Sequence, residues 1–188
     1  MTHDTYRNAI AWIRVLRPLV WGGAALLLLT PWVAMRFTDE VAWTGGDFVV
    51  FGAMLLAGCV AFETTARVAR VPSYLLASAI SIGTGFMLLW ANLAVGIVDE
   101  PGHRANLLFL GVLVVGALGA GVARLQARGM SRVLVAMALA QMAAGGIAMG
   151  MDTQESPTFV LAFTGLYVVA WLLSALLFHK AARALAAG

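Results

Sequence analysis

The sequence FVLAFTGLYVVAWLLSALLF, residues 159–178, runs for 20 positions without a charged side chain. A helix that crosses the hydrocarbon core of a bilayer, about 30 Å thick, needs about 20 mostly apolar residues. This stretch therefore predicts a transmembrane helix, and five stretches of similar length and character precede it. Together they predict an all-helical integral membrane bundle of six spans, at residues 18–35, 47–66, 74–98, 106–125, 133–151 and 159–178.

The composition of the whole chain agrees with that prediction. Of 188 residues, 62% are hydrophobic and 11% are charged, whereas a soluble domain has roughly 45–50% apolar and 25% charged residues. The lipid bilayer is therefore the solvent of most side chains. We divide the chain into a cytoplasmic interfacial segment at 1–17, a transmembrane domain at 18–178 and a cytoplasmic tail at 179–188.

Basic residues occupy alternate connections between the predicted spans. Ten of the 12 Lys and Arg residues fall on one face: Arg7, Arg14, Arg17, Arg67, Arg70, Arg124, Arg128, Arg132, Lys180 and Arg183. The opposite face carries Arg36, Arg104 and seven of the nine acids. Cytoplasmic loops carry an excess of Lys and Arg, so both termini are predicted to be cytoplasmic. Because these residues are dispersed juxtamembrane anchors, we expect no nucleic-acid partner despite the net charge of +3.

The residues before the first span allow two interpretations. Residues 8–17 alternate apolar side chains with Arg14 and Arg17, as a short helix lying at the membrane interface would. Alternatively, the first helix is longer and is kinked at Pro18. Proline is also common at the first position of a new helix, so the sequence leaves both interpretations open.

A tandem repeat is one interpretation of the spacing of charged residues. Asp39, Gly52, Arg67 and Arg70 are separated by 13, 15 and 3 positions, and the same spacings recur in Asp152, Gly165, Lys180 and Arg183. The chain would then consist of three two-helix hairpins in one orientation. The alternative is that any helix running from outside to inside begins after an acid and ends at a base, so that topology alone produces the pattern.

Three polar residues within the spans are candidates for function. Glu63 is ionisable and lies away from the end of its span; it either pairs with Arg67, four residues later, or faces the bundle interior as a proton or cation site. Asn92 and Gln141 are amides on faces rich in small residues, and such amides commonly form hydrogen bonds between helices.

The predicted outer loops contain a second group of candidates, which are oxygen ligands suited to a hard divalent cation, together with one histidine. These residues are Asp39, Glu40, Asp47, Asp99, Glu100, His103, Asp152 and Glu155. The alternative is an acidic surface that arises because topology excludes Lys and Arg from outer loops. No other cofactor is predicted, since the three histidines lie near or outside the membrane boundaries and cannot ligate a haem within the bilayer.

Two stretches, FTDEVAWTGGDF at residues 37–48 and WANLAVGI at 90–97, carry a family resemblance. They resemble the FTDEV-x-W and W-x-NLAVGI stretches of a family of small, uncharacterised, polytopic bacterial inner-membrane proteins, and the likeness extends to the segment ARGM at 127–130. The resemblance implies a multi-pass protein of the bacterial inner membrane. It implies no catalytic residue and no mechanism.

Three functions follow as hypotheses, because no motif of a known enzyme or transporter is present. The first is a binding or accessory membrane subunit, in which a stripe of small residues such as Ala77, Ser81 and Gly85 receives a partner helix or a second copy of the chain. The second is a transporter of a small solute or ion that uses Glu63. The third, which we favour least, is a membrane enzyme with a metal site at the acidic outer loops.

Overall fold

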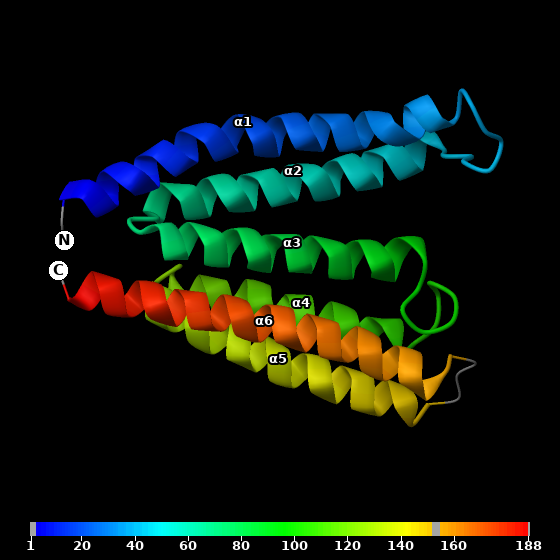
Figure 1. The fold of residues 1–188 in the computed structure, drawn as a ribbon. Helices are drawn as coiled ribbons and strands as arrows, with labels where there is room; N and C mark the ends of the chain where they lie inside the picture. The colour runs from blue at the N-terminus through cyan, green and yellow to red at the C-terminus, as the bar shows by residue number, and fades with distance from the viewer. Residues whose placement is uncertain (1–2, 152–154, 188) are drawn as a thin grey trace.

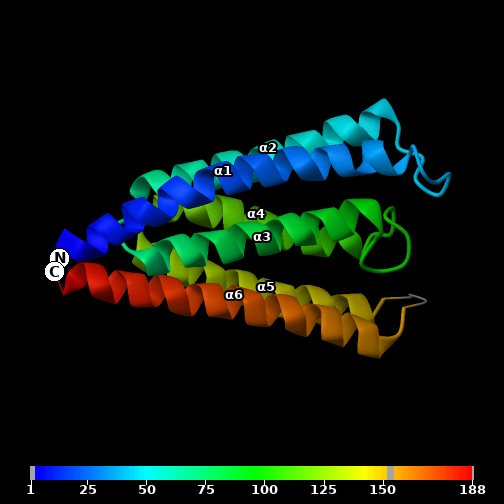
Figure 2. The ribbon, with the colours of Figure 1, turned by 45° about the horizontal axis from the view of Figure 1, so that its top comes forward.

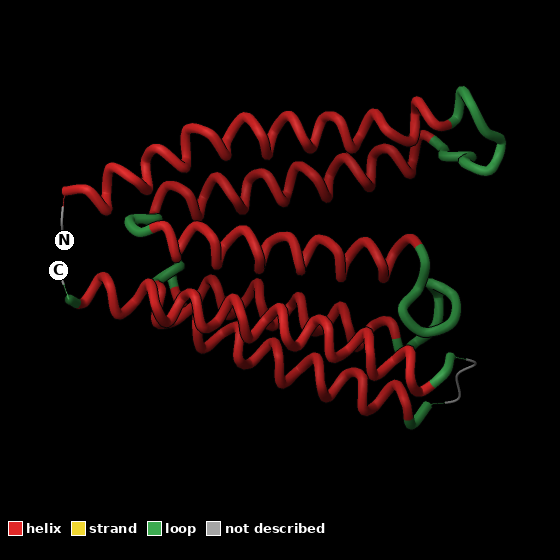
Figure 3. The backbone as a smooth tube through the Cα atoms, in the orientation of Figure 1, coloured by secondary structure: helices red, strands yellow, loops and turns green. Residues whose placement is uncertain are grey.

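The computed structural model describes residues 3–151 and 155–187, and describes side chains from residue 12 onward. It consists of six α-helices and contains no strand in the part that it describes (Figures 1 and 3). The helices are α1 (His3–Ala34), α2 (Gly45–Val68), α3 (Pro72–Ala94), α4 (Asn106–Ala123), α5 (Ala127–Met149) and α6 (Pro157–Ala186). All six are long and apolar enough to cross a membrane. The predicted six-span helical bundle is thereby confirmed.

The helices run up and down along a common direction (Figure 1). The start of α1, the end of α6 and the short α2–α3 and α4–α5 connections lie together, and we call this the terminal end. The α1–α2, α3–α4 and α5–α6 loops lie at the opposite end, which we call the loop end. The ten basic residues that the sequence places on one face all belong to the terminal end or to the helix turns beside it.

Packing is uneven across the bundle. The interface between α5 and α6 is the most extensive, α4 packs on α5, and α3 packs on α6. The core between them buries large side chains such as Trp171, Phe109 and Phe178. By contrast, α1 packs only lightly on α2 and α3, and it diverges from α6 toward the loop end (Figure 2). A peripheral helix that is loosely packed leaves space beside it.

Short polar contacts join the well-packed helices. The Ser174 hydroxyl of α6 donates to the Ala77 carbonyl of α3 at 2.7 Å, and the Ser131 hydroxyl of α5 donates to the Ala175 carbonyl of α6 at 2.9 Å. Small residues allow the backbones of membrane helices to approach closely. The stripe of Ala77, Ser81 and Gly85, predicted to receive a partner helix, is in fact partly covered by α6, because Trp171 also contacts the Gly85 position.

The helix boundaries differ from the predicted ones at several places. The first helix runs without interruption from His3 to Ala34 through Pro18, so residues 3–17 and the first span belong to one helix, as in the longer-helix interpretation. Proline removes one backbone hydrogen bond, but transmembrane helices tolerate this loss. At the other end of the chain, α6 continues past residue 178 to Ala186, because Ala181 and Ala182 are buried against the bundle and alanine favours helix.

The three predicted hairpins are not equivalent in packing. The α5–α6 pair is tightly packed, whereas α3 and α4 contact each other less than α3 contacts α6 or α4 contacts α5. The positions that would relate the first and third hairpins include Asp152, which lies outside the described residues. The internal repeat therefore stays a prediction.

Candidate binding groove beside α1

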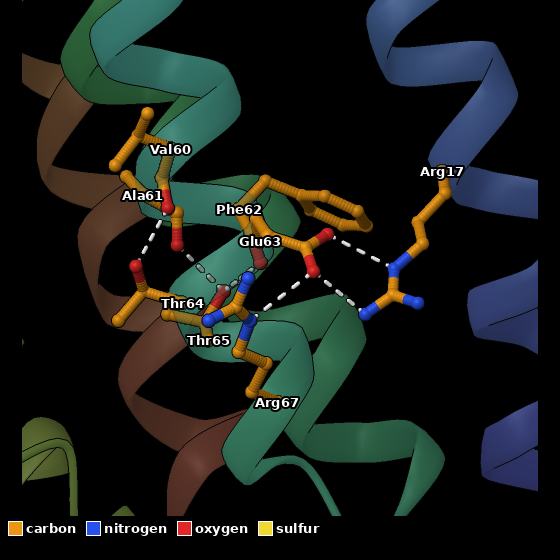
Figure 4. A network of polar contacts seen from close by, with 8 residues as sticks. All are labelled: Arg17, Val60, Ala61, Phe62, Glu63, Thr64, Thr65 and Arg67. Carbon is orange, nitrogen blue, oxygen red and sulfur yellow. Dashed lines mark hydrogen bonds and ion pairs between the residues drawn. The ribbon is translucent and has the colours of Figure 1, made fainter.

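Glu63 lies in an ion-pair cluster between α1 and α2 at the terminal end (Figure 4). Its carboxylate accepts from Arg17 Nε at 2.9 Å and from Arg17 Nη2 at 2.7 Å, and Arg67 Nε donates to it at 3.2 Å. The hydroxyls of Thr64 and Thr65 donate to carbonyls of the preceding turn instead. Glu63 thus pairs with Arg67, as in the structural alternative, and through Arg17 it also joins α2 to α1, which the sequence did not predict.

A double-mutant cycle on Glu63→Gln and Arg17→Gln tests this anchor. Each single change should lower the free energy of unfolding by about 1 kcal/mol, because the pair is bidentate but partly exposed. The double variant should lose little more than either single variant. The measurement is thermal unfolding in lipid nanodiscs. A functional proton site with no structural role would instead leave stability unchanged in Glu63→Gln.

Asn92 holds the α3–α4 loop together with Asn106, the first residue of α4. Asn92 Nδ2 donates to the Asn106 carbonyl at 2.7 Å, and both side chains are buried. Asn106 in turn accepts from the backbone N–H groups of Ile97 and Val98, each at 3.0 Å. It also donates to the carbonyls of Val98 at 3.2 Å and Glu100 at 2.8 Å. Asn92 therefore belongs to a loop-fixing network.

Gln141 is fully buried on α5, and its amide has no hydrogen-bond partner among the described residues. Thr164 Oγ1 and Trp171 Nε1 on the neighbouring helix α6 are also buried and lack a partner within the described part of the chain. No hydrogen bond or ion pair joins Gln141 to Glu63 or Asn92. The three intramembrane candidates consequently do not form one site.

Three acids of the predicted cation site belong to the α1–α2 loop and to the start of α2, namely Asp39, Glu40 and Asp47. Asp39 and Glu40 are exposed. Asp47 forms a capping box with Thr44: its carboxylate accepts from the Thr44 N–H at 2.7 Å and from the Thr44 hydroxyl at 2.8 Å. Capping boxes stabilise helix starts, so Asp47 has a local structural role.

The other predicted cation ligands are likewise dispersed. Asp99 lies 3.9 Å from His103 within the α3–α4 loop, and Glu100 of the same loop is exposed. Glu155 lies in the α5–α6 loop, and Asp152 is outside the described residues. Within residues 3–151 and 155–187, no three His, Cys, Asp or Glu residues gather as metal ligands would. The structure gives the predicted outer cation site no support.

The feature that the sequence did not predict is a groove between α1 and the α2–α3 pair. Its middle part is a cavity of about 490 Å³. Most of its lining residues have large apolar side chains, and five are small, namely Gly23, Ala24, Gly58, Ala79 and Gly83. The short side chains leave room at those five positions. The axes of ordinary packed helices lie about 8–10 Å apart, and the loose packing of α1 on α2 and α3 accounts for the space.

Two further cavities adjoin the middle cavity, and we include them in the groove: one toward the terminal end, between α1, α3 and α6, and one toward the loop end, between α1, α2 and α3. The terminal-end cavity, about 420 Å³, shares Leu16 and Ala79 with the middle cavity. The loop-end cavity, about 370 Å³, shares Leu27, Phe86 and Met87 with it. Along α1 the lining runs from Trp12 to Ala34. At 1.5 Å per residue this is about 33 Å, comparable to the thickness of the hydrocarbon core.

The two ends of the groove differ in chemistry. The loop end is aromatic: the ring centroids of Trp43 and Phe51 are 5.3 Å apart, and those of Phe51 and Trp90 are 4.6 Å apart. The FTDEVAW and WANLAVGI stretches thus meet through Trp43 and Trp90, whose centroids are 5.8 Å apart. The terminal end contains the polar side chains of Ser73 and Lys180.

Comparison of this chain with models of protein families, with curated proteins and with solved structures finds no match.

Proposed function

We propose that this chain is a multi-pass protein of the bacterial inner membrane that binds an apolar, chain-shaped ligand in the groove beside α1. The concentration of ten basic residues at the terminal end supports an orientation with both termini in the cytoplasm. The resemblance of the stretches at 37–48 and 90–97 supports the bacterial inner membrane.

The single observation that carries this proposal is the size and continuity of the groove. Each of its three parts lies within the range of about 300–1,000 Å³ that is typical of small-molecule sites. A transmembrane helix about 10 Å across would fill roughly 1,200 Å³ over half of the bilayer alone. The groove therefore suits a hydrocarbon chain better than a partner helix.

The other two hypotheses receive less support. A transporter that uses Glu63 would need an accessible carboxylate, but two arginines bind this one. An enzyme with an outer metal site would need clustered ligands, which the described residues do not provide. A ligand-binding membrane protein is the function that the geometry favours.

Filling the groove tests the proposal. Gly83 lines the middle cavity, and nothing lies within 4 Å of a Cβ built there, so Gly83→Leu should fold normally and occupy the space of the ligand. Excluding two or three methylene groups from the groove should lower ligand retention by at least about tenfold. Native mass spectrometry of protein released gently from membranes measures the retained mass.

Gly121→Leu is the matched control, because Gly121 is also a helical glycine with open space around its Cβ position, on α4 away from the groove. It should retain as much ligand as the unmodified chain. Equal retention in Gly83→Leu and Gly121→Leu would exclude the groove as the binding site.

A further inference from the structure

We infer that the ligand is an anionic phospholipid, seated with its headgroup at Lys180 at the terminal end and one acyl chain along the groove. This inference rests on the proposed function and adds to it the chemical class and the direction of the ligand. It follows from the charge of the terminal end, from the depth of the cavities and from the contrast with the loop end.

The terminal-end cavity combines an apolar wall with a basic rim. Leu16, Leu76 and Leu177 form part of the wall, and Lys180 and Ser73 contribute the polar atoms. Lys180 is exposed and has no ion-pair partner among the residues that the structure describes. A lysine can extend its apolar stem along such a wall while its ammonium reaches the headgroup region.

Charge complementarity selects an anionic headgroup. At the same end of the bundle, Arg17, which follows Leu16 of the cavity wall, shares the single carboxylate of Glu63 with Arg67, so that cluster carries one positive charge in excess. Lys180 adds another at the cavity itself. The first turn of α3, whose N-cap residue Val71 makes no side-chain cap, also lines this cavity, and the N-terminus of a helix carries partial positive charge.

The loop end of the groove would not favour the same headgroup. Its lining contains no basic residue; instead Trp43 and Trp90 lie there, as aromatic residues do at membrane interfaces. The loop that joins α1 to α2 at this end holds the exposed acids Asp39 and Glu40 and one base, Arg36, so its net charge is negative. An anionic headgroup would be repelled there and attracted to Lys180.

The depth of the cavities matches one leaflet. From Trp12, which lines the terminal-end cavity together with Lys180, to Gly23 in the wall of the middle cavity, α1 rises about 17 Å. Half of the hydrocarbon core is about 15 Å thick. One acyl chain that starts beside Lys180 would thus reach the bilayer midplane inside the middle cavity.

The test is a lipid competition measured by native mass spectrometry. The purified chain is offered phosphatidylglycerol and phosphatidylcholine that carry identical acyl chains. The unmodified chain should retain phosphatidylglycerol over phosphatidylcholine by about fivefold, the preference that one basic residue at a membrane surface contributes. Lys180→Gln should lose this preference but still retain lipid, and Lys180→Arg should keep it. Arg183→Gln, which removes a charge one turn further along α6 outside the cavity lining, is the matched control and should keep it too.

The outcomes for the Lys180 and Gly83 variants distinguish the anionic-headgroup inference from the proposed binding in the groove. Equal retention of both lipids, or an unchanged preference in Lys180→Gln, would overturn the anionic-headgroup assignment, while loss of both lipids in Gly83→Leu would still support the groove. Retention that Gly83→Leu does not change would overturn both. A stoichiometric partner protein in place of lipid would also overturn both.

Discussion

Replacing Asn106 with alanine is expected to lower the free energy of unfolding by about 3–4 kcal/mol, because one small side chain forms four hydrogen bonds to the backbone of the α3–α4 loop. Asn106 is 2% exposed, and Ile97 and Val98 are 1% and 0% exposed. Truncation would therefore leave buried N–H and carbonyl groups without partners, which costs more than the loss of the same bonds in water. Thermal or denaturant unfolding in detergent or nanodiscs measures the loss.

Two variants make this expectation specific. Asn92→Ala removes a single bond to the Asn106 carbonyl, so it should cost only about 1 kcal/mol. Asn106→Asp keeps the acceptor for Ile97 and Val98 but loses the donor to Val98 and Glu100. It should fall between alanine and the unmodified chain. If Asn106→Ala proved no worse than Asn92→Ala, the network would not hold the loop as the structure indicates.

The same loop explains where sequence reasoning placed a boundary wrongly. The third span was predicted to reach residue 98, but α3 ends at Ala94. Gly96 adopts a φ of +82°, and a Cβ there would lie 2.6 Å from the Asp99 carbonyl oxygen. The residues Val95 to Val98 are apolar enough to continue a span. Hydropathy could not reveal a turn that depends on Gly96 and on the Asn106 side chain, which binds the backbone of Ile97 and Val98.

The fold was predictable because it follows from local signals. Six apolar stretches are properties of consecutive residues, and they suffice to give the number of helices. The Glu63–Arg67 pair was predictable for the same reason, as its members lie four positions apart. Arg17 lies 46 positions from Glu63, and no pattern along the chain indicates that contact.

The groove was not predictable, for a related physical reason. Whether a helix packs tightly or leaves a cavity depends on how its side chains meet those of other helices. The small residues of α1 alone do not indicate whether α1 packs tightly or leaves a cavity. Gly145 on α5 and Gly83 on α3 illustrate the difference. A Cβ on Gly83 meets nothing within 4 Å, whereas a Cβ on Gly145 would collide with Thr164.

That collision makes Gly145→Ala the second change with a large expected effect. The added methyl would lie 2.9 Å from Thr164 Cγ2 and 3.0 Å from Thr164 Cβ, and closer still to its hydroxyl oxygen. The α5–α6 interface, the most extensive in the bundle, would have to separate locally. Overpacking of this kind costs about 1–3 kcal/mol, and we expect a loss near 2–3 kcal/mol in thermal unfolding.

The neighbouring glycine supplies the control. Nothing lies within 4 Å of a Cβ on Gly146, and this residue also lies inside α5. Gly146→Ala should therefore be neutral or raise stability by up to about 1 kcal/mol, because alanine favours helix over glycine. The two substitutions are chemically identical and one position apart, so a difference between them reports the contact with α6 and no general effect of the methyl group.

A compensating change identifies the contact itself. Thr164→Ala alone should be nearly neutral, since it removes a methyl group but also a buried hydroxyl that has no partner among the described residues. Combined with Gly145→Ala, it removes the two closest of the colliding atoms, the hydroxyl oxygen and Cγ2, and should recover about 1–2 kcal/mol of the loss. Two results would contradict this contact: additive losses in the double variant, or no loss in Gly145→Ala. Either would mean that α5 and α6 do not approach each other closely at Gly145 and Thr164. The buried Gln141, one turn away, would then lie in a looser interface than the structure shows.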